Sequence, residues 1–242
     1  MSNENRFPRT LRIGILVFDG FEPLDVWGFI EAFSISRFIG TNYFSPPPYP
    51  FEVVFISNEC KPDGGGTPAP VKSANGPRVA PDYFRDEALD QKIDLLMIPG
   101  GAGVRVLLAD DQPEPRRALL HWVRQMDERV AILSSVCTGA AILAAVGVLD
   151  GKPAATNHAS FAWVTGFGPR VQWDNVLRWV DAGRYITSAG VSAGTDMAFY
   201  LVQRLAGRAV AETAAKGAEY DWHRDPEEPI YYPQQAAVPG SR

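Results

Sequence analysis

Cys137 is the residue whose sequence surroundings most strongly indicate chemistry. It stands between a short apolar run at 131–136 and a Gly/Ala-rich helical pattern at 138–146, which predicts a buried strand that turns sharply into a helix. The free N–H groups and the positive dipole end at a helix start stabilise a thiolate and a nearby developing anion. The pattern therefore predicts a nucleophile elbow built on sulfur. A small, buried and inert cysteine is the alternative, because apolar burial raises a thiol pKa.

Two other groups come directly after predicted strands or turns. Asp25 lies in the first turn of a helical pattern that begins near Pro23, and Gly100 and Gly101 follow the apolar run 93–98. Glycines at the end of a parallel strand let the backbone approach a ligand and turn N–H groups toward it, which predicts an oxyanion or substrate-carbonyl loop. Their spacing does not match the dinucleotide fingerprint. The structural alternatives are a helix-dipole partner for the acid and a plain strand-to-helix turn for the glycines.

The elements that must position these groups alternate between strands and helices. Strand patterns cover 11–18, 51–57, 93–98 and 131–136, and helical patterns follow near 23–38, 115–129, 138–146, 196–205 and 209–220. This alternation predicts an α/β sandwich with a mainly parallel sheet, whose carboxyl edge collects ligand-binding residues. The segments 176–180 and 184–188 are predicted to form a separate two-stranded excursion. The Pro-rich stretch 45–50 is predicted to lie at the surface.

Composition and charge narrow the class of protein. The chain has 242 residues, of which 46% are hydrophobic and 21% charged, and a net charge of −5. These values predict one globular domain and argue against a nucleic-acid-binding face. We expect a loosely ordered leader over 1–10, a single domain over 11–225 and a Pro-rich tail over 226–242.

The cysteine count and the apolar stretches indicate the compartment. Cys60 and Cys137 lack any CxxC or Cys/His spacing, so we predict free thiols, no metal site and no cofactor. No secretory signal is apparent, and the longest apolar stretch, 140–149, is too short for a membrane span. We therefore expect a cytoplasmic protein without membrane or nucleic-acid partners.

Four motifs together resemble the ThiJ/PfpI superfamily, which has the class I glutamine amidotransferase-like fold. They are DGFEPLD at 19–25, IPGG at 98–101, SVCTG at 135–139 and ATNH at 155–158. The further motifs GVLDGK at 147–152 and VSAGTD at 191–196 look most like the isonitrile hydratase branch and the related ligand domain of AraC-type regulators. The resemblance implies a flavodoxin-like three-layer sandwich. It also implies a homodimer with the first helix near the interface.

Carried over by residue, the resemblance implies Cys137 as nucleophile and Asp25 as its acidic partner. Many relatives have glutamate at the second position, so the shorter aspartate fits the hydratase branch better. Thr138 stands where protease-like relatives have histidine, which argues against peptidase activity, and we group it with the catalytic residues.

The resemblance also implies a substrate-binding or oxyanion-binding set around the nucleophile. This set comprises Gly100, Gly101, His158 and Asp196. His158 matches a histidine found near the site in several branches, although Asn157 before it replaces an expected threonine. Asp196 matches an acidic residue near the site in the hydratases, and from its position alone it either caps a helix or points into the site.

The function that this resemblance implies is the addition of water to an isocyanide, giving an N-substituted formamide through a thioimidate on Cys137. Asp25 would act first as acid and then as base, and we expect the two groups to share one proton at rest. A glyoxalase or deglycase acting on 2-oxoaldehydes and a non-enzymatic ligand-sensing domain are the alternatives. An AraC-type regulator needs a further stretch of roughly a hundred residues for its DNA-binding units, and only 208–242 remain here, which disfavours DNA binding.

Overall fold

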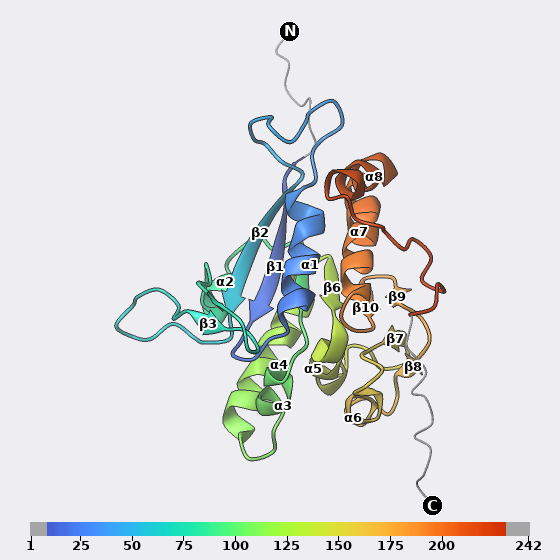
Figure 1. Ribbon diagram of the computed structural model, residues 1–242. Coiled ribbons are helices and arrows are strands. Elements are labelled where there is room, and N and C mark those ends of the chain that lie inside the picture. Colours follow the sequence, from blue (N-terminus) through green and yellow to red (C-terminus); the bar gives the residue numbers. More distant parts are fainter. Residues whose placement is uncertain (1–8, 231–242) are drawn as a thin grey trace, which may run out of the picture.

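The structure is a computed structural model that describes residues 9–230 (Figure 1). A six-stranded sheet runs through its middle in the order β2-β1-β5-β6-β10-β9. The pairs from β2 to β10 are parallel, and β9 alone is antiparallel to its neighbour. The predicted α/β fold with a mainly parallel sheet is confirmed. The strands are β1 Leu11–Val17, β2 Phe51–Ser57, β5 Leu95–Ile98, β6 Ile132–Ser135, β9 Trp179–Ala182 and β10 Tyr185–Ser188.

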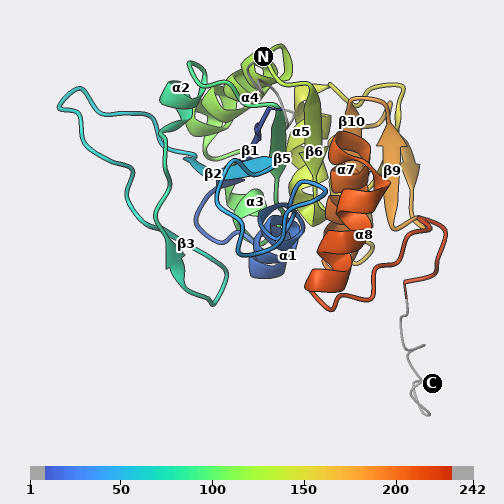
Figure 2. The ribbon, with the colours of Figure 1, turned by 90° about the horizontal axis from the view of Figure 1, so that it is seen from above.

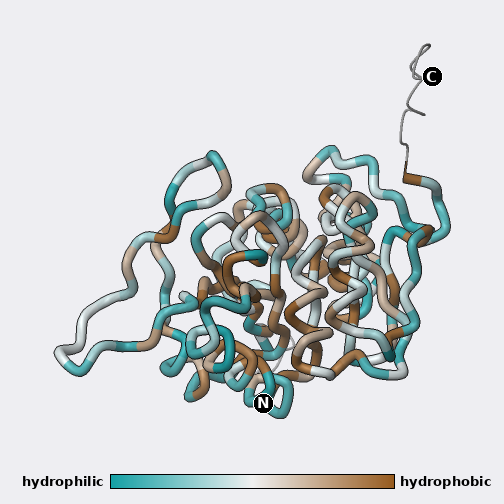
Figure 3. Tube along the Cα trace, turned by 90° about the horizontal axis from the view of Figure 1, so that it is seen from below, coloured by the Kyte–Doolittle hydropathy of each residue, from teal (hydrophilic) through white to brown (hydrophobic). Residues whose placement is uncertain are grey.

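Helices cover both faces of the sheet and make it the middle of three layers. Figure 2 shows α4 and α5 on one face and α1, α7 and α8 on the other. The strands at the centre of the sheet are therefore buried, as in β5 and β6, where all four residues of each strand are buried. Figure 3 shows the same pattern as hydrophobic residues in the centre and hydrophilic loops at the periphery. These helices are α1 Pro23–Ser34, α4 Pro113–Asp127, α5 Ala140–Val146, α7 Ala193–Ala206 and α8 Arg208–Gly217.

Smaller elements complete the described chain. Two strand pairs lie outside the main sheet, the antiparallel pair β3–β4 and the parallel pair β7–β8. Their bounds are β3 Val71–Lys72, β4 Arg78–Val79, β7 Pro153–Ala155 and β8 Gln172–Asp174. The short helices are α2 Arg85–Ala88, α3 Gly103–Leu107, α6 Phe161–Thr165 and the 3-10 turn Cys137–Gly139.

The prediction that 176–188 forms a two-stranded unit separate from the main sheet is wrong in one respect. The two strands do pair around a turn at Gly183, but β10 also pairs in parallel with β6 and so belongs to the main sheet. Strand β9 begins only at Trp179, because the Asp174 carboxylate accepts hydrogen bonds from the N–H groups of Val176 and Leu177 and holds them in a turn. The hairpin therefore extends the main sheet to its edge.

The predicted leader and tail lie mainly outside the described residues. Within the described part, Arg9 makes two hydrogen bonds to the carboxylate of Asp94, at 2.5 and 3.0 Å. At the other end, the carbonyl of Pro226 accepts the N–H of Arg178 at 2.8 Å. The Pro-rich stretch 45–50 has no regular structure and mostly exposed prolines, as predicted. Among residues 9–230, none of the helices has the length and apolar character needed to cross a bilayer.

Candidate active site

Cys137 lies in a strained turn between β6 and α5. Val136 before it is extended, with φ −115° and ψ 142°, whereas Cys137 has φ +57°. This left-handed conformation is uncommon for a residue other than glycine and persists only where neighbouring groups hold it. The Cys137 N–H donates to the carbonyl of Ala189 at 3.0 Å, and the Thr156 hydroxyl donates to the Cys137 carbonyl at 2.9 Å. The backbone at the predicted elbow is therefore held from two neighbouring segments.

Glycines allow two other loops to approach this turn closely. A Cβ at Gly100 would lie 2.8 Å from the Cβ of Cys137 and 2.6 Å from the Thr138 nitrogen. A Cβ at Gly190 would lie 3.1 Å from the Cys137 sulfur and 2.3 Å from the amide nitrogen of Asn157. Any side chain at these two positions would displace the cysteine or its neighbours. The loops after β5 and β10 therefore meet the loop after β6 at the carboxyl edge of the sheet.

Asp25 is buried next to Gly100. Its side chain is 0% exposed, and its Oδ2 accepts the Gly100 N–H at 2.7 Å. Its Oδ1 has no hydrogen-bond partner within the described residues. Burial raises the pKa of Asp25 to about 8, the Gly100 hydrogen bond lowers it, and the charge of Glu22 raises it further. At neutral pH the carboxyl group is therefore protonated.

The thiol of Cys137 also keeps its proton at neutral pH. Burial raises its pKa, the charge of Asp25 raises it further, and hydrogen bonds from the Thr138 amide and hydroxyl lower it. We expected the Cys137–Asp25 pair to share one proton at rest. Because both groups are buried, the structure instead favours two protons at neutral pH, and one must leave before the sulfur can attack.

A cavity of about 250 Å³ opens onto the sulfur. It makes the thiol reachable, although the Cys137 side chain is only 6% exposed. A larger hollow of about 560 Å³ lies against α1 and α8, but Cys137 is not among the residues that line it. We therefore place the candidate site at the smaller cavity, whose walls include Glu22, Gly101, Arg105, Cys137, Thr138 and Asn157.

The predicted glycine loop has its N–H groups bound to protein side chains. The Gly100 N–H is bonded to Asp25, and the Gly101 N–H donates to the Thr138 hydroxyl at 3.1 Å. Gly101 has φ +116°, a conformation that favours glycine. In this structure the two glycines therefore position the acid and the threonine hydroxyl, and neither N–H is left to face an oxyanion.

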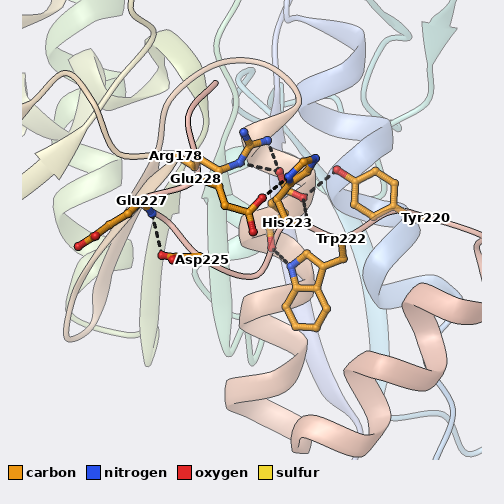
Figure 4. Close-up of polar contacts among 8 residues, drawn as sticks. Arg178, Tyr220, Trp222, His223, Asp225, Glu227 and Glu228 are labelled. Atoms are coloured by element: carbon orange, nitrogen blue, oxygen red, sulfur yellow. Dashed lines mark hydrogen bonds and ion pairs between the residues drawn. The ribbon is translucent and has the colours of Figure 1, made fainter. Parts of the chain in front are cut away.

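His158 and Asp196 are not among the residues that line this cavity. Burial lowers the pKa of His158, and the charge of Asp174 opposes that shift. Asp196 is fully buried in the first turn of α7, and its Oδ2 accepts two hydrogen bonds from Arg178, at 2.5 and 3.1 Å. Its Oδ1 accepts the Tyr220 hydroxyl at 2.9 Å and the His223 N–H at 3.1 Å. Figure 4 shows how the segment after α8 converges on this carboxylate.

The comparison with known families agrees with this geometry. A sequence profile described as the DJ-1/PfpI family matches residues 11–204. The chain belongs to the DJ-1/PfpI family. The matched range contains Asp25, both glycines and Cys137, so it includes every group described around the cavity.

Individual DJ-1/PfpI relatives differ in what they do. The isonitrile hydratase of Pseudomonas putida is 32% identical over 151 residues, which are 62% of this chain and 61% of the hydratase. The HTH-type transcriptional regulator GbdR of Pseudomonas aeruginosa is 27% identical over 151 residues, which are 62% of this chain and 38% of the regulator. The alignments thus span less than two thirds of either relative.

A solved structure supports the fold. A ThiJ/PfpI family protein from Pseudomonas syringae superposes with a TM-score of 0.70 at 24% identity, covering 90% of this chain and 78% of that protein. At this identity the likeness establishes the shared DJ-1/PfpI fold.

Sequence reasoning missed several residues around the sulfur of this DJ-1/PfpI chain. Glu22 could have been found, because it lies three residues before Asp25 in the same turn. Thr156 and Asn157 directly precede His158, and in this extended segment the sequence pattern indicated only the histidine as a site residue. Arg105 gave no signal, because an exposed charge on a short helix is ordinary on any surface.

Proposed function

We propose that this protein is a cysteine-dependent hydro-lyase that adds water to an isocyanide and releases an N-substituted formamide. The observation that carries the proposal is the buried carboxyl of Asp25, with one oxygen unpartnered among the described residues, beside a thiol in a strained turn. Isocyanide hydration needs an acid because the isocyanide carbon must gain a proton as the C–S bond forms. The 32% identity to an isonitrile hydratase supports this choice of reaction.

In the first step, after loss of one proton, the Cys137–Asp25 pair holds the other, and the Asp25 carboxylate takes it from the sulfur as the attack begins. The thiolate attacks the isocyanide carbon and forms the C–S bond, while Asp25 gives its proton to that same carbon. The product is a thioimidate on Cys137 and an ionised Asp25. Hydrogen bonds from Thr138 stabilise the thiolate before attack.

In the second step water adds to the thioimidate carbon. The carboxylate of Asp25 removes one proton from this water and passes it to the nitrogen. The remaining hydroxyl proton then moves to Asp25 as the C=O bond forms and the C–S bond breaks. The formamide leaves, and the enzyme regains one thiolate and one protonated carboxyl. In this scheme Gly100 positions Asp25, Gly101 positions Thr138, and neither His158 nor Asp196 contacts the substrate.

The test is incubation with a small alkyl isocyanide, with the formamide followed by NMR. We expect the wild-type protein to produce formamide and Cys137→Ala to produce none above the buffer rate. Intact mass spectrometry of the wild-type protein during turnover should detect an adduct with the mass of the isocyanide. Cys60→Ala is the matched control, since Cys60 is exposed and outside the cavity. Formamide production by Cys137→Ala at the wild-type rate would refute the proposal.

A parallel incubation with methylglyoxal separates this function from a glyoxalase activity. The same thiol and acid serve both reactions, so the geometry alone favours neither substrate. Formamide without lactate supports the hydratase. Lactate without formamide refutes it and supports the glyoxalase.

A further inference from the structure

Arg105 lines the Cys137 cavity, and its guanidinium group has no part in the mechanism described above. It projects from α3 and lines the cavity together with Cys137 and Thr138. Its guanidinium carbon lies 4.2 Å from the ring centroid of Trp163, which belongs to α6. Trp163 is itself packed edge-to-face against Phe167, with ring centroids 5.0 Å apart. A cation–π contact with a supported indole therefore favours one orientation of this exposed arginine.

The Trp163 ring covers one face of the guanidinium group and leaves the N–H donors at its edge free to bind a ligand. Within residues 9–230 Arg105 donates no side-chain hydrogen bond and has no carboxylate partner. Its five N–H donors form a planar fork that matches the two oxygens of a carboxylate. By contrast, Arg116, whose guanidinium lies 5.9 Å from the Phe167 ring centroid, is paired with Asp110. Arg105 thus differs from its neighbour in having its donors directed to no described group.

A second charge in the cavity orients such a ligand. Glu22 lines the same cavity, makes no ion pair with Arg105, and raises the pKa of both Asp25 and Cys137. An anionic group near Glu22 is repelled, whereas one near Arg105 is attracted. A substrate with a carboxylate therefore binds with that group at Arg105 and with its uncharged end toward the sulfur. The volume of about 250 Å³ restricts such a substrate to a small molecule.

We propose that Arg105, held by Trp163, is a specificity-determining residue that makes small carboxylate-bearing electrophiles the preferred substrates of Cys137. The isocyanide as the reacting group rests on the proposed hydratase function. For that function, the substrate class is a small isocyano carboxylic acid. The carboxylate accepts two hydrogen bonds from the guanidinium edge while the isocyanide carbon meets the thiol.

Matched substrates test the preference during turnover. The quantities to compare are kcat/KM for isocyanoacetate and 3-isocyanopropanoate and for the methyl ester of each. We expect the acid-to-ester ratio to fall about 10- to 100-fold in Arg105→Gln, as for loss of a charge-assisted bidentate contact. Arg105→Lys should recover only part of the ratio, because an ammonium lacks the planar fork. Arg116→Gln, an arginine near the same aromatic cluster but outside the cavity, should leave the ratio unchanged.

Alkylation tests the same preference without any turnover. The rate of Cys137 modification by iodoacetate is divided by the rate with iodoacetamide, and the site is identified by peptide mass spectrometry. We expect this ratio to fall in Arg105→Gln, while the ratio at the exposed Cys60 stays constant in the same samples. Trp163→Leu should lower the Cys137 ratio less than Arg105→Gln, because it loosens the guanidinium without removing its charge.

These outcomes separate the two proposals. If no isocyanide is hydrated but the alkylation ratio at Cys137 falls in Arg105→Gln, the hydratase function fails and the carboxylate preference stands. If isocyanides are hydrated but neither ratio changes in Arg105→Gln, the hydratase function stands and the role of Arg105 is refuted. An unchanged alkylation ratio in a protein that hydrates nothing refutes both.

Discussion

Asp25 and Asp196 are both fully buried in the first turn of a helix, but their carboxyl groups differ in their hydrogen-bond and charge partners. Asp25 in α1 accepts one hydrogen bond, from Gly100, and its other oxygen has no described partner. Asp196 in α7 accepts bonds from Arg178, Tyr220 and His223. Burial raises the pKa of both, but at Asp196 the arginine charge and the donors oppose that shift.

This difference agrees with the separate roles that the proposed mechanism gives the two carboxyl groups. A buried carboxylate that is paired and hydrogen-bonded contributes to structure, and breaking such a pair is costly. A buried carboxyl group that lacks a cation keeps its proton, as a general acid must near neutral pH. The ion pair with Arg178 therefore distinguishes Asp196 from Asp25, since both aspartates are fully buried.

The largest effect is expected from Asp25→Asn, which keeps the volume and the hydrogen bond from Gly100 but removes the transferable proton. Formamide production should fall by about 10²- to 10⁴-fold, the usual contribution of a general acid. Glu31→Gln is the matched control, because Glu31 is an acid of the same helix that lies outside the cavity, and it should leave kcat unchanged. Near-wild-type turnover by Asp25→Asn would remove the acid from the mechanism.

Asp196→Asn should mainly affect stability. The substitution leaves the buried Arg178 guanidinium, 4% exposed, without a counter-charge, and breaking a buried pair in this way costs about 3–5 kcal/mol. Urea denaturation should show this loss, whereas kcat per folded molecule should stay close to that of the wild type. A large fall in kcat with unchanged stability would return Asp196 to the active site, where the family resemblance had put it.

The two aspartates also show how far the sequence could predict the site. An acid in the first turn of a helix is the same local pattern in both cases, and the strand, glycine and cysteine patterns correctly predicted a parallel sheet whose loops meet at one edge. What separates Asp25 from Asp196 is contributed by distant segments. Arg178 comes from the loop before β9, and Tyr220 and His223 come from the segment after α8. No local periodicity encodes such partners.

The proton on Asp25 should make stability depend on pH. An aspartate in an unfolded chain has a pKa of about 3.9, whereas burial raises the pKa of Asp25 to about 8. Between these values the folded state binds a proton that the unfolded state does not, so the free energy of unfolding falls as pH rises. The contribution is complete below pH 4 and is lost progressively up to about pH 8, by as much as about 4 kcal/mol between pH 5 and pH 8.

The measurement is urea unfolding of wild type and Asp25→Asn at several pH values. The difference between the two proteins isolates Asp25 from other titrating groups, and Asp25→Asn should be relatively more stable at pH 8 than at pH 5. A difference that does not vary with pH would mean that Asp25 binds the same number of protons in the folded and the unfolded state.

The same titration should appear in the rate. Below about pH 8 the two-proton form of the Cys137–Asp25 pair dominates, because burial raises the pKa of both groups. The reactive one-proton form therefore increases with pH, and kcat/KM should rise by up to about tenfold per pH unit until the apparent pKa near 8. The pH profile of kcat/KM for formamide production checks this. A rate that is constant between pH 6 and pH 8 would support the single shared proton expected from the sequence.

The smallest effect is expected from Tyr220→Phe. The ring keeps its stacking on Phe199, with centroids 5.3 Å apart, and only the hydroxyl bond to Asp196 is lost. Because Arg178 and the His223 N–H still satisfy the carboxylate, we expect the free energy of unfolding to fall by only about 1 kcal/mol, measured by urea denaturation, with the pH profile of turnover unchanged. A loss as large as that of Asp196→Asn would mean that the partners of Asp196 act as one indivisible unit. A mild loss would show that the structural carboxylate tolerates the removal of one donor, whereas the chemical function of Asp25 depends on a single proton.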